Sequence, residues 1–247
     1  MIDLHCHILP QMDDGSPDIE ETMNMIRLAE RNDINVIVAT PHFTNYDAIE
    51  DFVDERNIKA VDVNRLIKEQ GYNVVIACGA EVFLSSEIFT ADSLDRLTIN
   101  GSKYLLCEYT LQPIENEKAL VYAEEVVSRG YIPIIAHPER YPSFYEDPTV
   151  VNELWDMGCR FQINASGLAG HGGREMQSFS LDLIRRGFVD VIATDAHSST
   201  FRNNKIISKI GEFPEELTKQ EIENLIHNYP LAILRKEELP HREVRYF

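Results

Sequence analysis

The chain has 247 residues, of which 44% are hydrophobic and 26% are charged. This composition is typical of a globular protein and excludes a collagen, a coiled coil and a wholly disordered chain. The 23 basic and 41 acidic residues give a formal net charge of −18, and a surface of that sign repels nucleic acid and anionic membranes. We therefore expect no nucleic-acid partner and no membrane insertion. The length favours one large domain, because α/β barrels commonly reach about 250 residues without a break.

The first residues contain no cationic segment followed by an apolar run, so we expect no signal peptide. The cysteines form no C-x-x-C pair. No arginine lies six positions after any of them, so the phosphate-binding loop of thiolate phosphatases is missing. Free, buried thiols are typical of a reducing compartment, and we expect a cytoplasmic protein. The four cysteines are Cys6, Cys78, Cys107 and Cys159.

Short β-branched runs alternate with amphipathic helical patterns along the chain. Apolar residues keep helical spacing over residues 19–29 and 119–127. The β-branched runs start about 30 residues apart, which is the length of one β-α unit. Seven such units predict an α/β fold with parallel strands, either a barrel or a doubly wound sheet. The predicted strands are Ile2–His5, Asn35–Ala39, Val74–Cys78, Tyr104–Glu108, Ile132–Ala136, Arg160–Asn164 and Asp190–Ala193.

No internal linker and no low-complexity tract interrupt this pattern, so residues 1–247 are predicted to form a single domain. The glycine-rich loop Gly167–Gly173 is flexible enough to act as a lid, and the sequence leaves its role open. The tail from Pro240 to Phe247 is short and mixed in charge, and we expect it to be mobile.

Histidines and carboxylates gather where the predicted strands end. His5 and His7 end the first strand, and Asp195 and His197 repeat the same spacing after the last one. In parallel α/β folds, ligands and catalysis lie at the carboxyl ends of strands. Because side chains alternate along a strand, His5 and His7 share one face and their apolar neighbours share the other. The neighbours expected to pack against helices are Ile2, Leu4, Cys6 and Ile8.

Nine residues at the ends or exits of successive strands are candidate metal ligands. Imidazole and carboxylate together suit Zn, Mn or Fe. Nine ligands are too many for one ion and suit two or three ions with a bridging carboxylate and water. The sequence pattern does not separate Asp14 from its neighbour Asp13. The candidates are His5, His7, Asp14, His42, Glu81, Glu108, His137, Asp195 and His197.

The charges of such a centre favour phosphate as a ligand. Its four carboxylates contribute −4, whereas three divalent ions would contribute +6. Arg140 lies three residues after His137 and Arg202 lies five residues after His197, so both belong to loops at the same edge. Guanidinium groups bind phosphate oxygens in a bidentate manner. We therefore predict that both arginines bind phosphate, and that a hydroxide formed between the ions attacks it.

At this point the sequence resembles a known family. Asp-Leu-His-Cys-His over residues 3–7, followed by Met-Asp-Asp-Gly over residues 12–15, resembles the opening motif of the PHP (polymerase and histidinol phosphatase) superfamily. Further motifs resemble the CpsB/YwqE type, the metal-dependent protein-tyrosine phosphatases of bacterial capsule and exopolysaccharide systems. The match runs in order from residue 1 to about residue 205. These motifs are Ala-Thr-Pro-His ending at His42, Gly-Ala-Glu ending at Glu81, the strand ending in Glu108, Ala-His-Pro-Glu-Arg ending at Arg140, and Thr-Asp-Ala-His ending at His197.

The resemblance implies a distorted seven-stranded TIM-like (β/α)7 barrel, the PHP fold, that holds three divalent ions. It implies manganese as the functional metal, with iron and zinc left open. It also implies that the substrate is phosphotyrosine on a bacterial tyrosine kinase that autophosphorylates and controls polysaccharide assembly. Carried over by motif, the three ligand sets are His5, His7, Glu81 and Asp195; Glu81, Glu108 and His137; and Asp14, His42 and His197.

Other functions share part of this pattern. A small-molecule phosphatase such as histidinol phosphatase would use most of the same site. A PHP nuclease or proofreading module fits poorly with the charge of −18. A metal-dependent amidohydrolase commonly uses a strand lysine as a carbamate bridge, whereas this chain has Glu81 and Glu108 at strand ends. A metal-binding scaffold without activity would need no arginines at the site.

Overall fold

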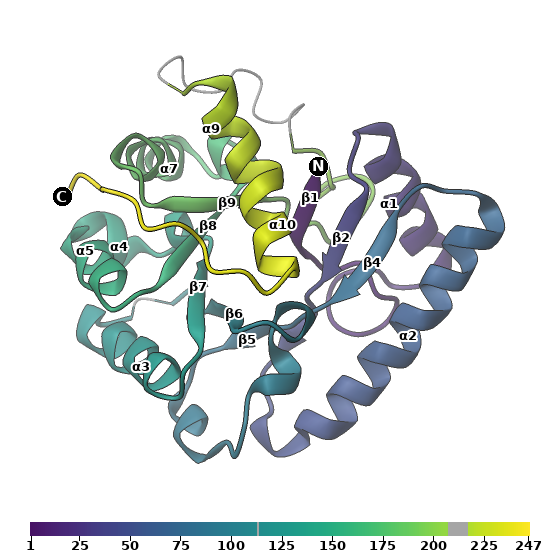
Figure 1. Cartoon of the computed structure of the whole chain (residues 1–247), viewed down its shortest axis with the longest axis horizontal. Helices are drawn as coiled ribbons and strands as arrows, with labels where there is room; N and C mark the ends of the chain where they lie inside the picture. The colour runs from purple at the N-terminus through teal and green to yellow at the C-terminus, as the bar shows by residue number, and fades with distance from the viewer. Residues whose placement is uncertain (113, 207–216) are drawn as a thin grey trace.

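Two parallel β-sheets form the centre of the computed structural model, which describes residues 1–112, 114–206 and 217–247. The strand order is β1-β2-β4 in the smaller sheet and β3-β5-β6-β7-β8-β9 in the larger one, and every pair is parallel (Figure 1). The strands are β1 (Ile2–Cys6), β2 (Val36–Ala39), β3 (His42–Phe43), β4 (Val75–Cys78), β5 (Glu81–Phe83), β6 (Tyr104–Glu108), β7 (Ile132–Ala136), β8 (Arg160–Asn164) and β9 (Val189–Ala193).

The two sheets are joined through their backbones. Only residues 40–41 separate β2 from β3, and only residues 79–80 separate β4 from β5. Hydrogen bonds cross both interruptions, because Gly79 N donates to Ala39 O at 2.9 Å and Glu81 N donates to Pro41 O at 3.1 Å. At the other edge, Asp195 N donates to His5 O at 2.8 Å just beyond β9. The first and last strands therefore lie side by side.

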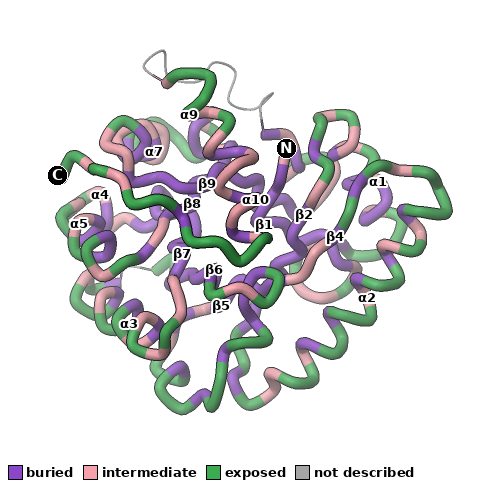
Figure 2. The backbone as a smooth tube through the Cα atoms, viewed as in Figure 1, coloured by how far each residue is buried: buried purple, intermediate pink, exposed green. Residues whose placement is uncertain are grey.

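Helices cover the outer side of the strands. In Figure 1, α1 and α2 lie beside β2 and β4, whereas α3, α5 and α7 lie outside β7 to β9. Most strand residues are buried, and the outward faces of these helices are exposed (Figure 2). The helices are α1 (Ile19–Arg31), α2 (Ile49–Gln70), α3 (Asn116–Ser128), α4 (Pro142–Glu146), α5 (Thr149–Asp156), α6 (Ala165–Leu168), α7 (Arg174–Arg186), α9 (Lys219–Glu223) and α10 (Tyr229–Leu234), with a π-helical segment η6 (Asn224–Asn228) between the last two.

Buried apolar side chains form two clusters, and β1 contributes to both. Cys6 and Ile8 belong to the larger cluster, together with α1 residues such as Ile26. Ile2 and Leu4 belong to the smaller cluster, which combines residues of β6, β7, β9 and α10. The expectation that Ile2 and Leu4 share one face with Cys6 and Ile8 is therefore wrong. The pairing of β1 with β2 shifts register between Asp3 and Cys6, and such an irregularity changes which face later side chains occupy.

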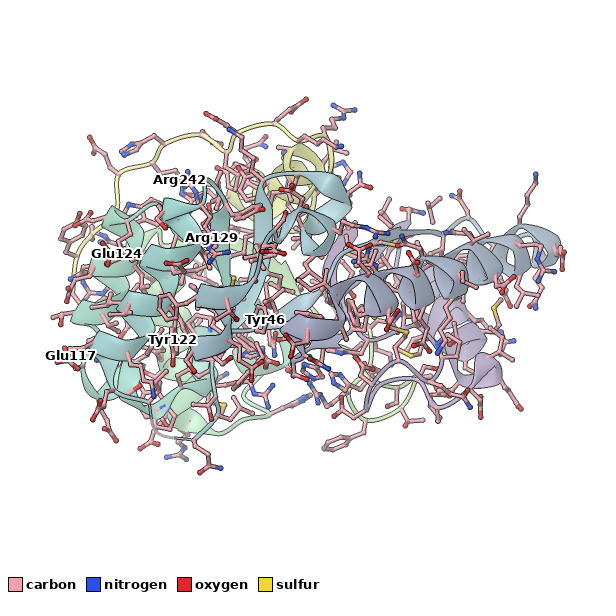
Figure 3. All side chains as sticks on the ribbon, turned by 90° about the horizontal axis from the view of Figure 1, so that it is seen from below. Tyr46, Glu117, Tyr122, Glu124, Arg129 and Arg242 are labelled. Carbon is pink, nitrogen blue, oxygen red and sulfur yellow. The ribbon has the colours of Figure 1, made fainter. Side chains whose placement is uncertain are left out.

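The C-terminal tail, which the sequence predicts to be mobile, packs against the outside of the fold. Phe247 stacks on Phe188 with ring centroids 5.8 Å apart, and Arg245 N donates to Arg186 O at 2.8 Å. Arg242, which is labelled in Figure 3, lies 2.9 Å from the buried carboxylate of Asp190 at the start of β9.

Among the residues that the structure describes, no helix has the length and apolar character needed to cross a bilayer.

Candidate metal centre

Eight of the nine candidate ligands lie at the carboxyl ends of strands or within four residues beyond them, and Asp14 lies in the loop between β1 and α1. Register places two of them next to each other, because His42 on β3 pairs with Glu81 on β5. Glu108 ends β6, and His137 follows β7 directly. The site therefore forms at the edge of the sheets where parallel α/β folds bind ligands.

Glu81 lies at the centre of the first group, which also contains His5, His7 and Asp195. One ligand atom from each of these four buried residues lies within 4.8 Å of the others. Glu81 Oε2 is 3.1 Å from His5 Nε2, 3.2 Å from His7 Nε2 and 3.1 Å from His42 Nδ1. No hydrogen bond satisfies this buried oxygen. A cation among the three imidazoles would satisfy it.

The second group contains His42, Glu81 and Glu108. Its ligand atoms also lie within 4.8 Å of one another, and His42 Nδ1 is 2.8 Å from Glu108 Oε1. The expected set had His137 in place of His42. His137 Nε2 instead lies 2.8 Å from the other oxygen of Glu81, Oε1. The structure thus brings His137 to the centre through Glu81 and adds His42 beside Glu108.

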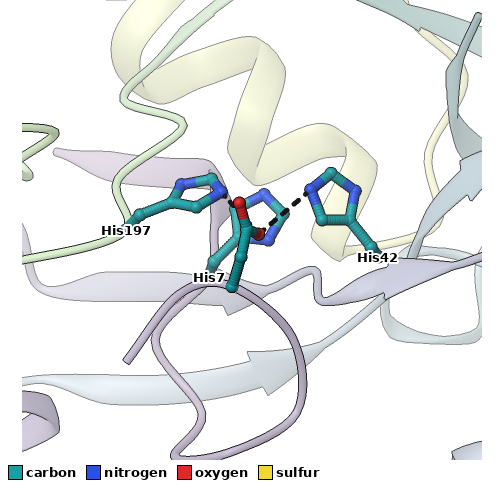
Figure 4. Close-up of side chains that lie close together, drawn as sticks. His7, His42 and His197 are labelled. Atoms are coloured by element: carbon teal, nitrogen blue, oxygen red, sulfur yellow. Dashed lines mark ion pairs between the residues drawn. The ribbon is translucent and has the colours of Figure 1, made fainter. Parts of the chain in front are cut away.

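The third group contains Asp14, His42 and His197, as expected, and adds His7. Asp14 Oδ1 is 3.5 Å from His42 Nε2 and 3.2 Å from His197 Nε2 (Figure 4). Asp13 has a different position, because its Oδ2 accepts a hydrogen bond from His7 Nδ1 at 2.6 Å. The structure therefore separates the two neighbouring acids, with Asp14 facing the imidazoles and Asp13 behind one of them.

The imidazoles are oriented in the way that metal coordination requires. Nδ1 of His5 contacts Gln162 Oε1 at 2.9 Å, and Nδ1 of His197 contacts the backbone oxygen of Asp195 at 3.0 Å. A proton on Nδ1 leaves the lone pair of Nε2 free, and metal-binding histidines commonly have such a partner on the other nitrogen. His197 Nε2 is buried and has no hydrogen-bond partner. The donor set and its unsatisfied atoms therefore fit divalent metal ions.

Electrostatic interactions at the centre favour ionised acids. Burial alone would raise the pKa of Glu81 and Asp195, but the nearby imidazoles, first of all His5, hold both pKa values well below their usual range. Burial and the neighbouring His7 lower the pKa of His197 to about 4. These pKa shifts leave carboxylate oxygens and a neutral His197 imidazole available as ligands at neutral pH.

Backbone geometry at the centre is unusual in three places. His137 has φ 35° and Asp195 has φ 51°, although side chains with a Cβ rarely adopt positive φ. Both residues come just after a strand, and the left-handed conformation redirects the chain there. Gly15 has a different constraint, because a Cβ on it would lie 2.2 Å from His7 O. Only glycine lets the loop after β1 pass this close to His7.

Two residues that contact the candidate ligands, Gln162 and Asn164, were not predicted from the sequence. Gln162 and Asn164 lie on β8, and Gln162 Nε2 donates to Asn164 Oδ1 at 2.8 Å. Asn164 Nδ2 in turn donates to Asp195 Oδ2 at 2.9 Å, while Gln162 contacts His5. The two amides therefore connect His5 to Asp195. Their i, i+2 spacing at the end of a predicted strand, the same as for His5 and His7, was the available signal.

Both predicted phosphate-binding arginines reach the centre. Arg202 Nη2 is 2.7 Å from Asp195 Oδ1, and Arg140 Nη1 is 3.3 Å from Asp195 Oδ2. Both guanidinium groups are partly exposed. They line a cavity of about 860 Å³, whose wall also includes Met176 and Phe201. The fold and this site define an α/β protein with a strand-end group of candidate metal ligands and an adjoining cavity lined by two arginines.

Known proteins resemble this chain in sequence and in structure. A family model described as capsular polysaccharide synthesis, CpsB/CapC, matches residues 1–235. The chain therefore belongs to the CpsB/CapC family, which confirms the resemblance seen in its motifs.

Two relatives show how far the similarity extends. Tyrosine-protein phosphatase YwqE of Bacillus subtilis (strain 168) is 36% identical over 215 residues, which are 82% of this chain and 80% of YwqE. Tyrosine-protein phosphatase CpsB of Streptococcus pneumoniae is 30% identical over 211 residues, which are 80% of this chain and 83% of CpsB.

A solved structure supports the same relationship. The crystal structures of YwqE and CpsB, described as unique metal-dependent tyrosine phosphatases, include a chain that matches this one with a TM-score of 0.84 and 30% identity. The match covers 100% of this chain and 99% of that chain.

Proposed function

We propose that this member of the CpsB/CapC family is a metal-dependent protein-tyrosine phosphatase that removes phosphate from phosphotyrosine. The observation that carries the proposal is that Arg140 and Arg202 converge on Asp195, a candidate ligand, beside a large cavity. Relatives named tyrosine-protein phosphatases and the metal-dependent solved structure support it. Cysteine does not act as the nucleophile.

The three groups of ligand atoms support three divalent ions, and we assign manganese as the functional metal, with iron and zinc as alternatives. When bound, such ions polarise a phosphate ester and lower the pKa of coordinated water. His5, His7, Glu81 and Asp195 would hold one ion. The remaining ligands would come from Asp14, His42, Glu108, His137 and His197.

Arg140 and Arg202 bind the phosphate oxygens that face the cavity. Each guanidinium gives one hydrogen bond to Asp195 and retains further N–H donors for a phosphate. Asp195 thereby fixes both side chains before the substrate arrives. This preorganisation matters because the arginines must neutralise charge that is redistributed in the transition state.

The remaining proposals concern the fold and the cellular context. The joined sheets and the contact between β1 and the end of β9 support a closed, distorted seven-stranded barrel of the PHP type. The capsule-synthesis family supports an autophosphorylating bacterial tyrosine kinase as the phosphorylated partner. The four free thiols, of which Cys6, Cys107 and Cys159 are buried, support a cytoplasmic location.

The proposal can be tested by measuring phosphate release from three substrates: a phosphotyrosine peptide, the same peptide with phosphoserine, and histidinol phosphate. The protein is first stripped with a chelator and then loaded with Mn²⁺, Fe²⁺ or Zn²⁺. We expect no release from the stripped protein and fastest release from phosphotyrosine after loading with manganese. Preferred turnover of histidinol phosphate, or full activity without metal, would overturn the proposal. Metal analysis of the loaded protein tests the stoichiometry of three.

A further inference from the structure

Phe201 is exposed at an unusual position. Its side chain is 89% exposed, the highest value among the large apolar side chains that the structure describes. It directly precedes Arg202 and follows the candidate ligand His197 by four residues. An exposed phenylalanine forgoes the stabilisation that burial of its ring would provide. The site beside it offers a reason for its position.

The loop that carries Phe201 is held in place on several sides. His197 N donates to Arg202 O at 2.7 Å, which closes the loop at its base. Ser199 N donates to Glu21 Oε1 at 2.6 Å, and Asn204 Nδ2 donates to Met25 O at 2.9 Å, so α1 anchors both ends. The ring of Phe201 is thus presented outward by an ordered loop.

Phe201 and Arg202 together separate two cavities, because both residues line each of them. The smaller cavity, of about 580 Å³, is lined by acidic residues that include Asp14, Asp18 and Glu20. The larger one, of about 860 Å³, contains both phosphate-binding arginines. A phosphorylated ligand would therefore enter the larger cavity.

The larger cavity also has apolar surface besides Phe201. Met176 lines it from α7, next to Gly172 of the glycine-rich loop. A Cβ on Gly172 would lie 2.2 Å from Met176 Sδ, so the missing side chain lets the methionine lie against this loop. A volume of about 860 Å³ is far larger than a phosphate group and falls within the ~300–1,000 Å³ range of ligand sites. The cavity has room for the group that the phosphate is attached to.

We propose that Phe201 determines the specificity for aryl phosphates by contacting the phenol ring of phosphotyrosine at the rim of this cavity. The ring is one ester bond away from the phosphate that Arg202 binds, and Phe201 is the neighbour of Arg202 in the chain. Aromatic pairs prefer offset or edge-to-face contact and gain energy beyond burial alone. An alkyl phosphate has no aromatic ring and cannot make this contact with Phe201. The inference rests on the proposed phosphate binding by Arg140 and Arg202.

Two non-hydrolysable inhibitors test the proposal on the metal-loaded enzyme. Phenylphosphonate carries the ring, whereas methylphosphonate carries only the charged group. Phe201→Ala should raise the Ki of phenylphosphonate about tenfold, equivalent to about 1.4 kcal/mol, and leave that of methylphosphonate within twofold. On a phosphotyrosine peptide, KM should rise by a similar factor with little change in kcat. Phe201→Trp should retain tight binding of phenylphosphonate.

Matched variants distinguish an error in the role of Phe201 from an error in the proposed phosphate binding by Arg202. Phe89→Ala removes another exposed phenylalanine, 45% exposed and on the segment Ser86–Thr90, and should change neither Ki. An unchanged Ki of phenylphosphonate in Phe201→Ala, or an equal rise in both constants, would overturn the role of Phe201. Arg202→Ala should raise both constants. If Arg202→Ala left the Ki of methylphosphonate unchanged, the proposal that Arg202 binds phosphate would be wrong. The comparison of the two inhibitors in Phe201→Ala would still test the role of Phe201.

Discussion

His7 Nδ1 donates a hydrogen bond of 2.6 Å to Asp13 Oδ2. The same carboxylate oxygen accepts the backbone N–H of His42 at 2.9 Å, and the other oxygen accepts Gly15 N at 2.9 Å. Asp13 therefore connects the loop after β1, one imidazole of the centre and the start of β3. Burial alone would raise the pKa of Asp13, but the hydrogen bond from His7 and its charge lower it well below its usual range. Asp13 thus remains a carboxylate that fixes the His7 ring.

The first prediction is that Asp13→Asn weakens metal binding while Asp13 itself contacts no ion. Loss of a carboxylate behind a ligating histidine typically costs about 10–100-fold in metal affinity, because the ring loses its orientation and basicity. Competition with a chromogenic chelator measures the affinity for Mn²⁺. Asp92→Asn, at an exposed position, is the control. An affinity equal to wild type in Asp13→Asn would show that His7 needs no such support.

The second prediction is that catalysis survives the loss of every thiol. Burial raises the pKa of all four cysteines, most strongly at Cys6 and Cys107, so thiolates are scarce at neutral pH. The variant in which all four are replaced by serine or alanine should keep kcat within about threefold once it is loaded with metal. Thermal unfolding confirms that the variant is folded. A loss of several orders of magnitude in a folded, metal-loaded variant would contradict a metal-dependent mechanism.

Much of the fold follows from the sequence because its strands are short, apolar and evenly spaced. Each of the seven predicted strands occurs within one residue of its predicted bounds, and three match at both ends: Tyr104–Glu108, Ile132–Ala136 and Arg160–Asn164. The strands β3 and β5 were not predicted, since two or three residues are too few for a periodic pattern. These two strands carry His42 and Glu81 and align them in register.

The grouping of the candidate residues was predictable from the sequence, and their arrangement was less so. Residue types at strand ends indicated all nine candidates, which the structure brings together. The register shift in β1 is a property of its pairing with β2, so alternation alone placed Ile2 and Leu4 on the wrong face. The packed tail was also unpredictable, because Phe247 and Arg242 contact residues far away in the sequence.

The third prediction concerns the ion pair between Arg242 and the buried Asp190. Burial raises the pKa of Asp190, and Arg242 and Arg160 offset part of that rise. A folded-state pKa above the unfolded value means that the folded protein binds the proton more tightly. The contribution of Asp190 to the free energy of unfolding therefore falls as pH rises from about 3.8 through the raised pKa. Removing Arg242 raises the folded-state pKa of Asp190 further, so the pH range over which this contribution falls becomes wider.

Arg242→Ala should thus destabilise the protein more at pH 8 than at pH 5. Leaving a buried charge unpaired costs about 3 kcal/mol when it is ionised, and protonation relieves this cost at the lower pH. Urea unfolding of the wild type and of Arg242→Ala gives the difference in their free energies of unfolding at each pH. The double variant Arg242→Ala with Asp190→Asn should lose this pH dependence. Arg245→Ala, on the same tail, should show an equal cost at both pH values. An equal cost for Arg242→Ala as well would refute the argument.

The fourth prediction concerns the two arginines at Asp195. Arg140 and Arg202 each donate to one oxygen of this carboxylate and line the larger cavity. Removal of one preorganised charged donor typically costs about 3 kcal/mol in the transition state, on the order of 10²-fold in rate. We expect each alanine variant to lose about this much in kcat/KM on a phosphotyrosine peptide. The variants Arg140→Lys and Arg202→Lys should keep only part of the activity, because an ammonium group lacks the planar set of N–H donors of a guanidinium.

Metal content decides how this fourth result is interpreted, because Asp195 is both a candidate ligand and the partner of the two arginines. Each variant must hold as much metal as wild type when its kinetics are measured. Asp195→Asn provides the comparison, since it should lose metal as well as activity. Full metal content with a 10²-fold loss in the arginine variants assigns them to the phosphate. Near wild-type kcat/KM in both would leave phosphate binding to the metal ions alone.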